Sequence, residues 1–180
     1  GGGRCPIINL SGGTEVGACF LSPTPLTPLK PGSLGAPCFG MSVEVWDPQT
    51  AQPLGPGDGV GELVCTSPWP SMTRGFYGDG GRERYLETYY DAWPGVWRHG
   101  DWASIDMDGA WFLHGRSDDT INVAGKRIGP AEYESIVVDH ESIAEAAAIG
   151  VPDPVKGEQV WLLCIMAPGR RASDRLRTVL

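Results

Sequence analysis

Short strand-like segments separated by turns occupy the first two thirds of the chain. Residues 42–46 alternate between apolar and polar side chains, the period of two that is typical of a half-buried β-strand. Residues 61–66 follow the turn-rich segment 55–59 and predict a second strand. The pattern therefore predicts a meander of antiparallel strands.

A hairpin is predicted at residues 102–114. Two strand-like segments, 102–107 and 110–114, flank Asp108-Gly109, a dipeptide that favours a two-residue hairpin turn. Nearer the start of the chain, the apolar run at residues 6–10 predicts another short strand. Closely spaced prolines from Pro23 to Pro37 predict an extended surface loop, because proline prevents helix formation and most sheet pairing.

The last third combines strands with one helix. A second hairpin is predicted around Ala124-Gly125, and Pro130 occupies a favourable first helical position. The spacing of Tyr133, Ile136 and Val137 predicts that this helix buries one apolar stripe. Strands are expected near 145–150 and 159–166, which makes the order β-β-α-β-β.

Glycine and proline limit the amount of helix. The chain has 26 glycines and 16 prolines among 180 residues, well above the average share of about 12%. Few windows lack one of them, so long helices are excluded and residues 85–90 predict only a short helix. Seven tryptophans and 41% hydrophobic residues nevertheless indicate a packed core, to which we assign Trp93, Trp97, Trp102 and Trp111.

Charge and cysteine usage exclude several classes of protein. The net charge is −8, with 14 basic and 22 acidic residues, and the densest basic cluster lies only at residues 170–177, so we expect no nucleic-acid partner. No apolar run reaches the roughly 18 residues that a membrane helix requires. The five cysteines form no C-x-x-C pair, which favours neither a zinc site nor a disulfide framework and fits a reduced cytoplasm.

Gly12-Gly13-Thr14-Glu15 follows the first predicted strand and is the first candidate site. Glycines allow backbone N–H groups to approach a phosphate, the Thr14 hydroxyl can donate to it, and the Glu15 carboxylate can hold its Mg²⁺. The same residues also suit an ordinary turn with an exposed acid.

Two further segments have the chemistry of a nucleotide site. Asp101, beside Gly100, can accept two hydrogen bonds from a ribose diol, or it can lie in a strand-edge turn. Arg116 can bind ribose or phosphate oxygens as a fork, or it can pair with Asp118 or Asp119 on the surface. Residues 125–127 can form a polar hairpin tip, and the three histidines support no Ser-His-Asp triad.

These segments occur in a fixed order that resembles one family. Thr14-Glu15, residues 98–101 and residues 115–128 together resemble the adenylate-forming (AMP-binding) superfamily, and within it the acetyl-CoA and acetoacetyl-CoA synthetases. Other segments that support this resemblance are 68–72, 84–89, 129–135, 144–152 and 155–158.

The resemblance implies a β-rich α+β fold in two parts. Residues 1–117 would be the end of a large AMP-binding domain, with an antiparallel, barrel-like subdomain. Residues 118–180 would be part of a small mobile C-terminal domain, with Asp118 as the hinge. The upstream phosphate loop and the C-terminal catalytic lysine have no counterpart, so we expect a C-terminal fragment that is inactive alone.

The resemblance also assigns roles near the start of the chain. Thr14 would contact the α-phosphate, with the backbone of Gly13 beside it, and Glu15 would help to hold Mg²⁺. Asp101 would accept hydrogen bonds from both ribose hydroxyls, and Asn9 would lie near the adenine.

Further roles fall on the second half of the chain. Arg116 would reach the ribose and phosphate, and Arg127 would lie near the phosphate in the thioester-forming state. Ala124 and Gly125 would line the tunnel for the pantetheine arm of coenzyme A.

The implied reaction is ATP-dependent activation of a small carboxylic acid as acyl-AMP, followed by transfer to coenzyme A. Three positions depart from the family pattern: Ser11 replaces the usual aromatic residue, His99 stands where Thr or Ser is commoner, and Gly12 replaces a Trp that floors the acyl pocket of acetyl-CoA synthetases. The missing indole predicts an acid larger than acetate, either a short or medium acyl acid or an aryl acid. The alternatives are an adenylation domain that feeds a carrier protein and a non-catalytic nucleotide-binding remnant.

Overall fold

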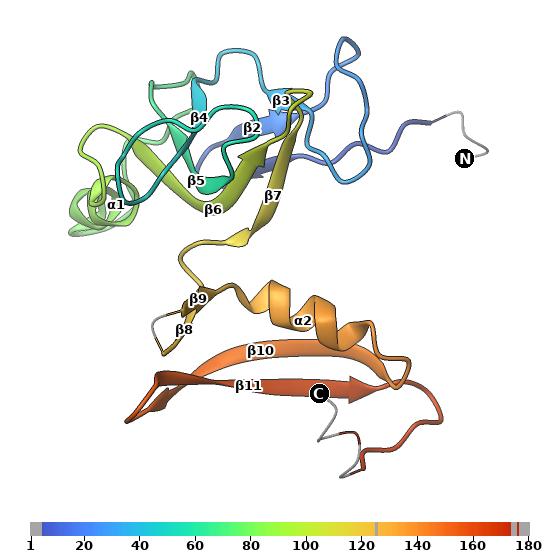
Figure 1. The fold of residues 1–180 in the computed structure, drawn as a ribbon. Coiled ribbons are helices and arrows are strands. Elements are labelled where there is room, and N and C mark those ends of the chain that lie inside the picture. Colours follow the sequence, from blue (N-terminus) through green and yellow to red (C-terminus); the bar gives the residue numbers. More distant parts are fainter. Residues whose placement is uncertain (1–4, 125, 174–175, 177–180) are drawn as a thin grey trace. The chain divides into compact units, whose positions relative to one another are not determined.

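The chain forms two compact units in a computed structural model that describes residues 5–124, 126–173 and 176. Unit 1 is Gly1–His114 and unit 2 is Gly115–Leu180 (Figure 1). The boundary predicted between residues 117 and 118, with its hinge at Asp118, stays a prediction.

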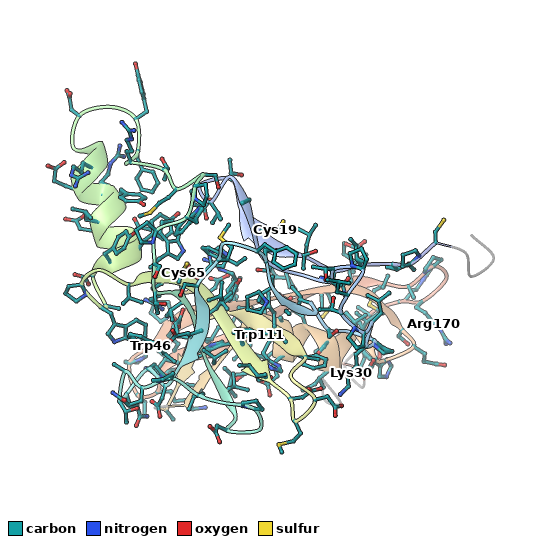
Figure 2. The ribbon with its side chains drawn as sticks, turned by 90° about the horizontal axis from the view of Figure 1, so that it is seen from above. Cys19, Lys30, Trp46, Cys65, Trp111 and Arg170 are labelled. Atoms are coloured by element: carbon teal, nitrogen blue, oxygen red, sulfur yellow. The ribbon has the colours of Figure 1, made fainter. Side chains whose placement is uncertain are left out.

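The described residues of unit 1 form two antiparallel sheets and one helix. Strands β1 (Ser11–Gly13), β2 (Ala18–Ser22) and β3 (Ala36–Pro37) form the first sheet in that order. The second sheet has the order β4 (Val43–Trp46), β5 (Val60–Cys65), β6 (Trp97–Ile105) and β7 (Trp111–Arg116). The last two residues of β7 fall in the range of unit 2. Trp46 and Cys65 mark the two ends of the β4–β5 pair (Figure 2). Helix α1 (Gly81–Tyr90) lies in the connection between β5 and β6.

The core of unit 1 is aromatic and centres on Trp97, the first residue of β6. Its ring stacks on Tyr89 of α1 with centroids 3.7 Å apart and packs edge-on against Trp69 at 5.2 Å. Phe20 of β2 packs in turn against Trp69 at 5.1 Å. Aromatic pairs of this kind add stability beyond the area that they bury, so β2, α1 and β6 are held by one cluster. The predicted core role is confirmed for Trp97 and Trp111, which are buried, whereas Trp93 and Trp102 are only half-buried and lie outside the core cluster.

Unit 2 has the predicted order β-β-α-β-β. Strands β8 (Ile121–Val123) and β9 (Lys126–Ile128) form a hairpin, and β10 (Ile143–Asp153) and β11 (Gly157–Met166) form a longer one. The sheet order is β10-β11-β8-β9. Helix α2 (Pro130–Val138) lies along β10, on one face of the long hairpin (Figure 1). The β-rich α+β fold class is therefore confirmed.

Three local predictions are wrong. Residues 6–10 form no strand and are exposed, because the first sheet begins only with the pairing of Ser11 and Leu21. The turn at Asp108-Gly109 is longer than two residues, because Asp106 accepts hydrogen bonds from the backbone N–H groups of Asp108 and Ala110, both at 2.9 Å.

The buried stripe of α2 is the third. Val137 is buried and Tyr133 is half-buried, but the Ile136 side chain is 68% exposed. Helix α2 meets β10 through the Val137 side, and Glu134 on the helix accepts the N–H of Ala148 at 2.9 Å. This contact sets the rotation of the helix and leaves Ile136 outside.

We expect Trp97→Ala to destabilise unit 1 by about 3–5 kcal/mol, because it removes an aromatic ring from the centre of the core. The matched control is Trp161→Ala in β11, whose ring is half-exposed and whose loss is expected to cost below about 1 kcal/mol. Urea unfolding followed by circular dichroism measures both. Equal losses for the two variants would contradict the central role of Trp97.

Candidate functional site

The Gly12–Glu15 segment forms the end of β1 and the turn into β2. The carbonyl of Gly13 accepts hydrogen bonds from the N–H groups of Val16 and Gly17, both at 3.1 Å. Thr14 is exposed, and the half-buried Glu15 carboxylate folds back over Gly13, where a Cβ atom would meet it. The turn thus leaves Thr14 exposed and keeps the Glu15 carboxylate over Gly13.

Two side chains from a distant loop fix this turn. The Trp69 Nε1–H and the Ser71 hydroxyl both donate to the carbonyl of Val16, at 2.9 and 2.8 Å. Because Trp69 also belongs to the aromatic core, the turn is tied directly to the centre of unit 1.

Gly12 allows β1 and β2 to approach closely. A Cβ atom at this position would meet the carbonyl oxygen of Ala18 and would lie 2.9 Å from the Cα of Cys19. The strand register also shifts between Ser11 and Gly12. The backbone of β2 therefore fills the space into which a side chain at position 12 would extend.

Asp101 lies inside β6, so the strand-edge turn that could have explained it is wrong. The Asp101 residue is only 9% exposed, and its Oδ2 lies 3.6 Å from Nε2 of His99. His99 in turn packs edge-on against Phe20 at 4.9 Å. Carboxylates are seldom buried to this extent without a structural or functional reason.

Phe20 connects the two parts of the site in unit 1. It lies on β2, directly after the turn that carries Thr14 and Glu15, and it contacts the histidine beside Asp101. Asn9 belongs to the exposed segment before β1, where its Nδ2 reaches the carbonyl of Ser33 at 3.5 Å.

Arg116 forms a fork with Asp118 in unit 2. Its Nε donates to Oδ1 of Asp118 at 2.8 Å, and a second guanidinium nitrogen contacts Oδ2. The surface pairing considered from the sequence is thus present. Both side chains are about half exposed, and such a pair contributes at most about 1 kcal/mol. A ligand phosphate or ribose can therefore compete for Arg116.

Ala124 ends the first arm of the β8–β9 hairpin. Its φ of 51° is left-handed, and its N–H donates to the carbonyl of Lys156 at 2.8 Å. Gly125 and the side chain of Arg127 lie outside the described residues, so their predicted roles stay predictions.

Comparison with known proteins identifies the family. Residues 132–180 match the AMP-binding enzyme C-terminal domain. The acetyl-coenzyme A synthetase of Methanothrix thermoacetophila is 43% identical to this chain over 98% of the chain's residues. The enzyme of Magnetococcus marinus is 41% identical over 100% of this chain. The chain belongs to the adenylate-forming superfamily.

Solved structures place the chain in the acyl-CoA synthetase branch of that superfamily. The acetoacetyl-CoA synthetase of Streptomyces lividans superposes with a TM-score of 0.78 at 40% identity, over 94% of this chain and 25% of that one. An anthranilate CoA ligase superposes with a TM-score of 0.71 at 27% identity, over 96% of this chain and 31% of the ligase chain. The chain spans 27–28% of the length of the two curated relatives named above.

The residues present fit the Mg²⁺ that the superfamily resemblance implies. Mg²⁺ is commonly held by one or two carboxylates together with substrate phosphates and water. Glu15 supplies one carboxylate in the residue after Thr14, and the described residues contain no cluster of three or more metal-binding side chains. Glu15 would therefore hold the ion jointly with the nucleotide phosphates.

None of the described helices is long and apolar enough to cross a membrane.

The thiols of Cys38 and Cys65 do not suit nucleophilic chemistry. Burial raises the pKa of the Cys65 thiol, and burial together with the neighbouring Cys19 thiol raises the pKa of Cys38 (Figure 2 labels Cys19 and Cys65). Both thiols are protonated at neutral pH, whereas the thiolate is the reactive form.

Glu62 and Glu158 are two of the carboxylates whose structural roles were not predicted from the sequence. Glu62 is only 2% exposed and pairs with Arg98 at 3.2 Å, because β5 lies between β4 and β6 and is buried on both faces. Glu158 accepts the backbone N–H of Asn122. The glycines at positions 150 and 157 are the available sequence signal, since they flank the tight packing around Glu158.

In this member of the superfamily, we expect Gly12→Ala to lower the free energy of unfolding by about 1–3 kcal/mol, because the new methyl group meets rigid backbone. Gly13→Ala is the matched control. There the new methyl meets only the end of the flexible Glu15 side chain, so the cost is expected to stay below about 1 kcal/mol. Thermal unfolding of both variants tests this difference, and a larger loss for Gly13→Ala would contradict it.

Proposed function

We propose that this chain supplies the nucleotide turn and the mobile C-terminal part of an ATP-dependent, AMP-forming acyl-CoA synthetase. The observation that carries the proposal is the 43% identity to an acetyl-coenzyme A synthetase over nearly the whole chain. The geometry of unit 1 supports it, because Phe20 links the Thr14–Glu15 turn to the strand that carries Asp101.

Unit 1 would bind the nucleotide. Thr14 donates to the α-phosphate, the Gly13 backbone lies beside it, and Asp101 accepts the two ribose hydroxyls. Asn9 lies near the adenine. Glu15 helps to hold Mg²⁺, which supplies charge neutralisation for the phosphates when it is bound.

Unit 2 would act mainly in the second half of the reaction. Arg116 leaves its fork with Asp118 to bind ribose and phosphate oxygens, and Asp118 is the hinge for rotation of the small domain. Ala124 and Gly125 line the path of the pantetheine arm, and Arg127 lies near the phosphate in the thioester-forming state. A hinge allows one pocket to serve two steps.

The proposed reaction has two half-reactions, adenylate formation and thioester formation. The acid's carboxylate oxygen attacks the α-phosphorus, a P–O bond to pyrophosphate breaks, and acyl-AMP forms. The thiol of coenzyme A then attacks the acyl carbon, the proton of the thiol is lost, and AMP leaves. Cationic side chains offset the negative charge that develops on the phosphate. We place the protein in the cytoplasm, with a small carboxylic acid, ATP and coenzyme A as its ligands.

The acid is proposed to be larger than acetate. This rests on Gly12, which stands where an indole would floor the acyl pocket. The backbone of β2 occupies the position of a Cβ atom there, so a larger pocket would need space beyond the β1–β2 pair.

A chimera tests the proposed activity. This chain replaces the matching segment of the Methanothrix thermoacetophila enzyme, and we expect the chimera to catalyse ATP–pyrophosphate exchange and thioester formation. Asp101→Ala in the chimera should lower exchange about a hundredfold, because two hydrogen bonds to a charged acceptor are lost. Exchange kinetics with ATP and acid measure this.

Asp79→Ala is the control for Asp101→Ala, because it removes one exposed carboxylate of the same unit. It should leave exchange within about twofold. A folded chimera without exchange activity would contradict the proposed function, and equal effects of the two variants would contradict the role of Asp101.

The choice of acid is tested on the same chimera with its unaltered parent as the reference. The ratio of kcat/KM for a four-carbon acid over acetate is expected to rise about tenfold relative to the parent, the effect of one or two methylene groups in an apolar pocket. A ratio of kcat/KM values equal to that of the parent would contradict the proposal of a larger acid.

A further inference from the structure

The Glu158 carboxylate joins the two hairpins of unit 2. It lies near the start of β11, and its Oε2 accepts the backbone N–H of Asn122 in β8. The other carboxylate oxygen lies over Gly150 of β10, 2.5 Å from the point where a Cβ atom would be. A side chain at position 150 would therefore displace the carboxylate.

Lys156, two residues before Glu158, makes a second contact between the two hairpins. The carbonyl of Lys156 accepts the N–H of Ala124 at 2.8 Å, and Gly157 pairs with Val123. Gly157 has a left-handed φ of 82°, and a Cβ atom there would lie 3.6 Å from the carbonyl oxygen of Asn122, an ordinary contact. One end of the β10–β11 hairpin thus holds the arm of β8 at three successive residues, 122–124.

Strand β8 needs such support. It has three residues, and a two-stranded hairpin of this length is at best marginally stable in water. Ala124 also has a left-handed φ of 51°, which is unfavourable for a residue with a side chain and persists only where its surroundings impose it. The N–H of Ala124 is held by the carbonyl of Lys156, and two residues earlier the N–H of Asn122 is held by the carboxylate of Glu158.

We infer that Glu158 is a positioning residue for the β8–β9 tip, acting on the transfer of the acyl group to coenzyme A and not on adenylate formation. This rests on the proposed function, in which Ala124 and Gly125 line the path of the thiol. Thr14 and Asp101, which serve the first step in that proposal, belong to unit 1, whereas Glu158 belongs to unit 2.

Four variants separate positioning from general stability. Glu158→Ala removes the acceptor, whereas Glu158→Gln keeps a carbonyl oxygen that can accept the Asn122 N–H. Gly150→Ala removes no polar group but pushes the carboxylate aside, and its methyl group would also lie 3.2 Å from Cγ2 of Ile121 in β8. Glu134→Ala is the matched control, since it also removes a carboxylate that accepts a backbone N–H, but one that joins α2 to β10.

Amide hydrogen exchange of the 180-residue chain, followed by NMR, tests the contact itself. Exchange at Asn122 and Ala124 should accelerate about tenfold in Glu158→Ala and in Gly150→Ala, the effect expected from losing a hydrogen bond to a charged group. Glu158→Gln should restore most of the protection, and Glu134→Ala should leave these two amides unchanged. Unchanged exchange in Glu158→Ala, or equal acceleration in Glu134→Ala, would overturn the inference.

Kinetics of the chimera test the consequence. In Glu158→Ala the KM for coenzyme A should rise about tenfold while ATP–pyrophosphate exchange stays within about twofold, and Glu158→Gln should recover the parent KM. Glu134→Ala should not separate the two half-reactions. An equal fall of both half-reactions in Glu158→Ala would overturn the inference, whereas an inactive parent chimera contradicts the proposed function and leaves the exchange result to decide the role of Glu158.

Discussion

Unit 1 depends on the packing around the Trp97 indole. Rings from β2, from the loop after β5 and from α1 converge on this one residue, although they come from segments far apart in the sequence. Trp97 begins β6, so its burial sets the position of the strand that carries His99 and Asp101. Trp69 belongs to the same cluster and holds the Val16 carbonyl, which fixes the turn at Thr14. The core and the proposed nucleotide site are therefore one structure.

Close backbone approaches at glycines also shape unit 1. At Gly12 the missing side chain lets the β1 and β2 backbones come together, and at Gly81 it lets α1 begin against the carbonyl of Phe76. Any other residue would push these elements apart. The high glycine content thus reflects tight contacts at particular positions. At Gly12 one such contact lies at the entrance to the Thr14–Glu15 turn.

Local patterns predicted the elements of the fold better than their ends. The strands at 42–46 and 61–66 and the helix at Pro130 follow from periodicity and proline position, which are local properties. The exposure of Ile136 and the burial of Glu62 were not predictable, because each depends on which neighbouring element packs there. The longer turn at residues 106–110 depends on the Asp106 side chain, which competes with the backbone for N–H groups. Within the site, the motif residues could be named from the resemblance, but the link through Phe20 and His99 required the three-dimensional structure.

Acidic side chains take the place of missing backbone acceptors throughout the chain. N–H groups in turns lie outside the strand ladders and need other acceptors. Asp106 and Asp153 each accept two backbone N–H groups, and Glu134 and Glu158 accept one each between elements. The N–H groups of Lys156 and Val155 lower the pKa of Asp153, so this turn keeps its bonds at neutral pH and loses them only as the pH falls through that lowered pKa. Several of the acids that make the net charge −8 are therefore structural acceptors, and Glu158 is the one whose partner leads to the β8–β9 tip.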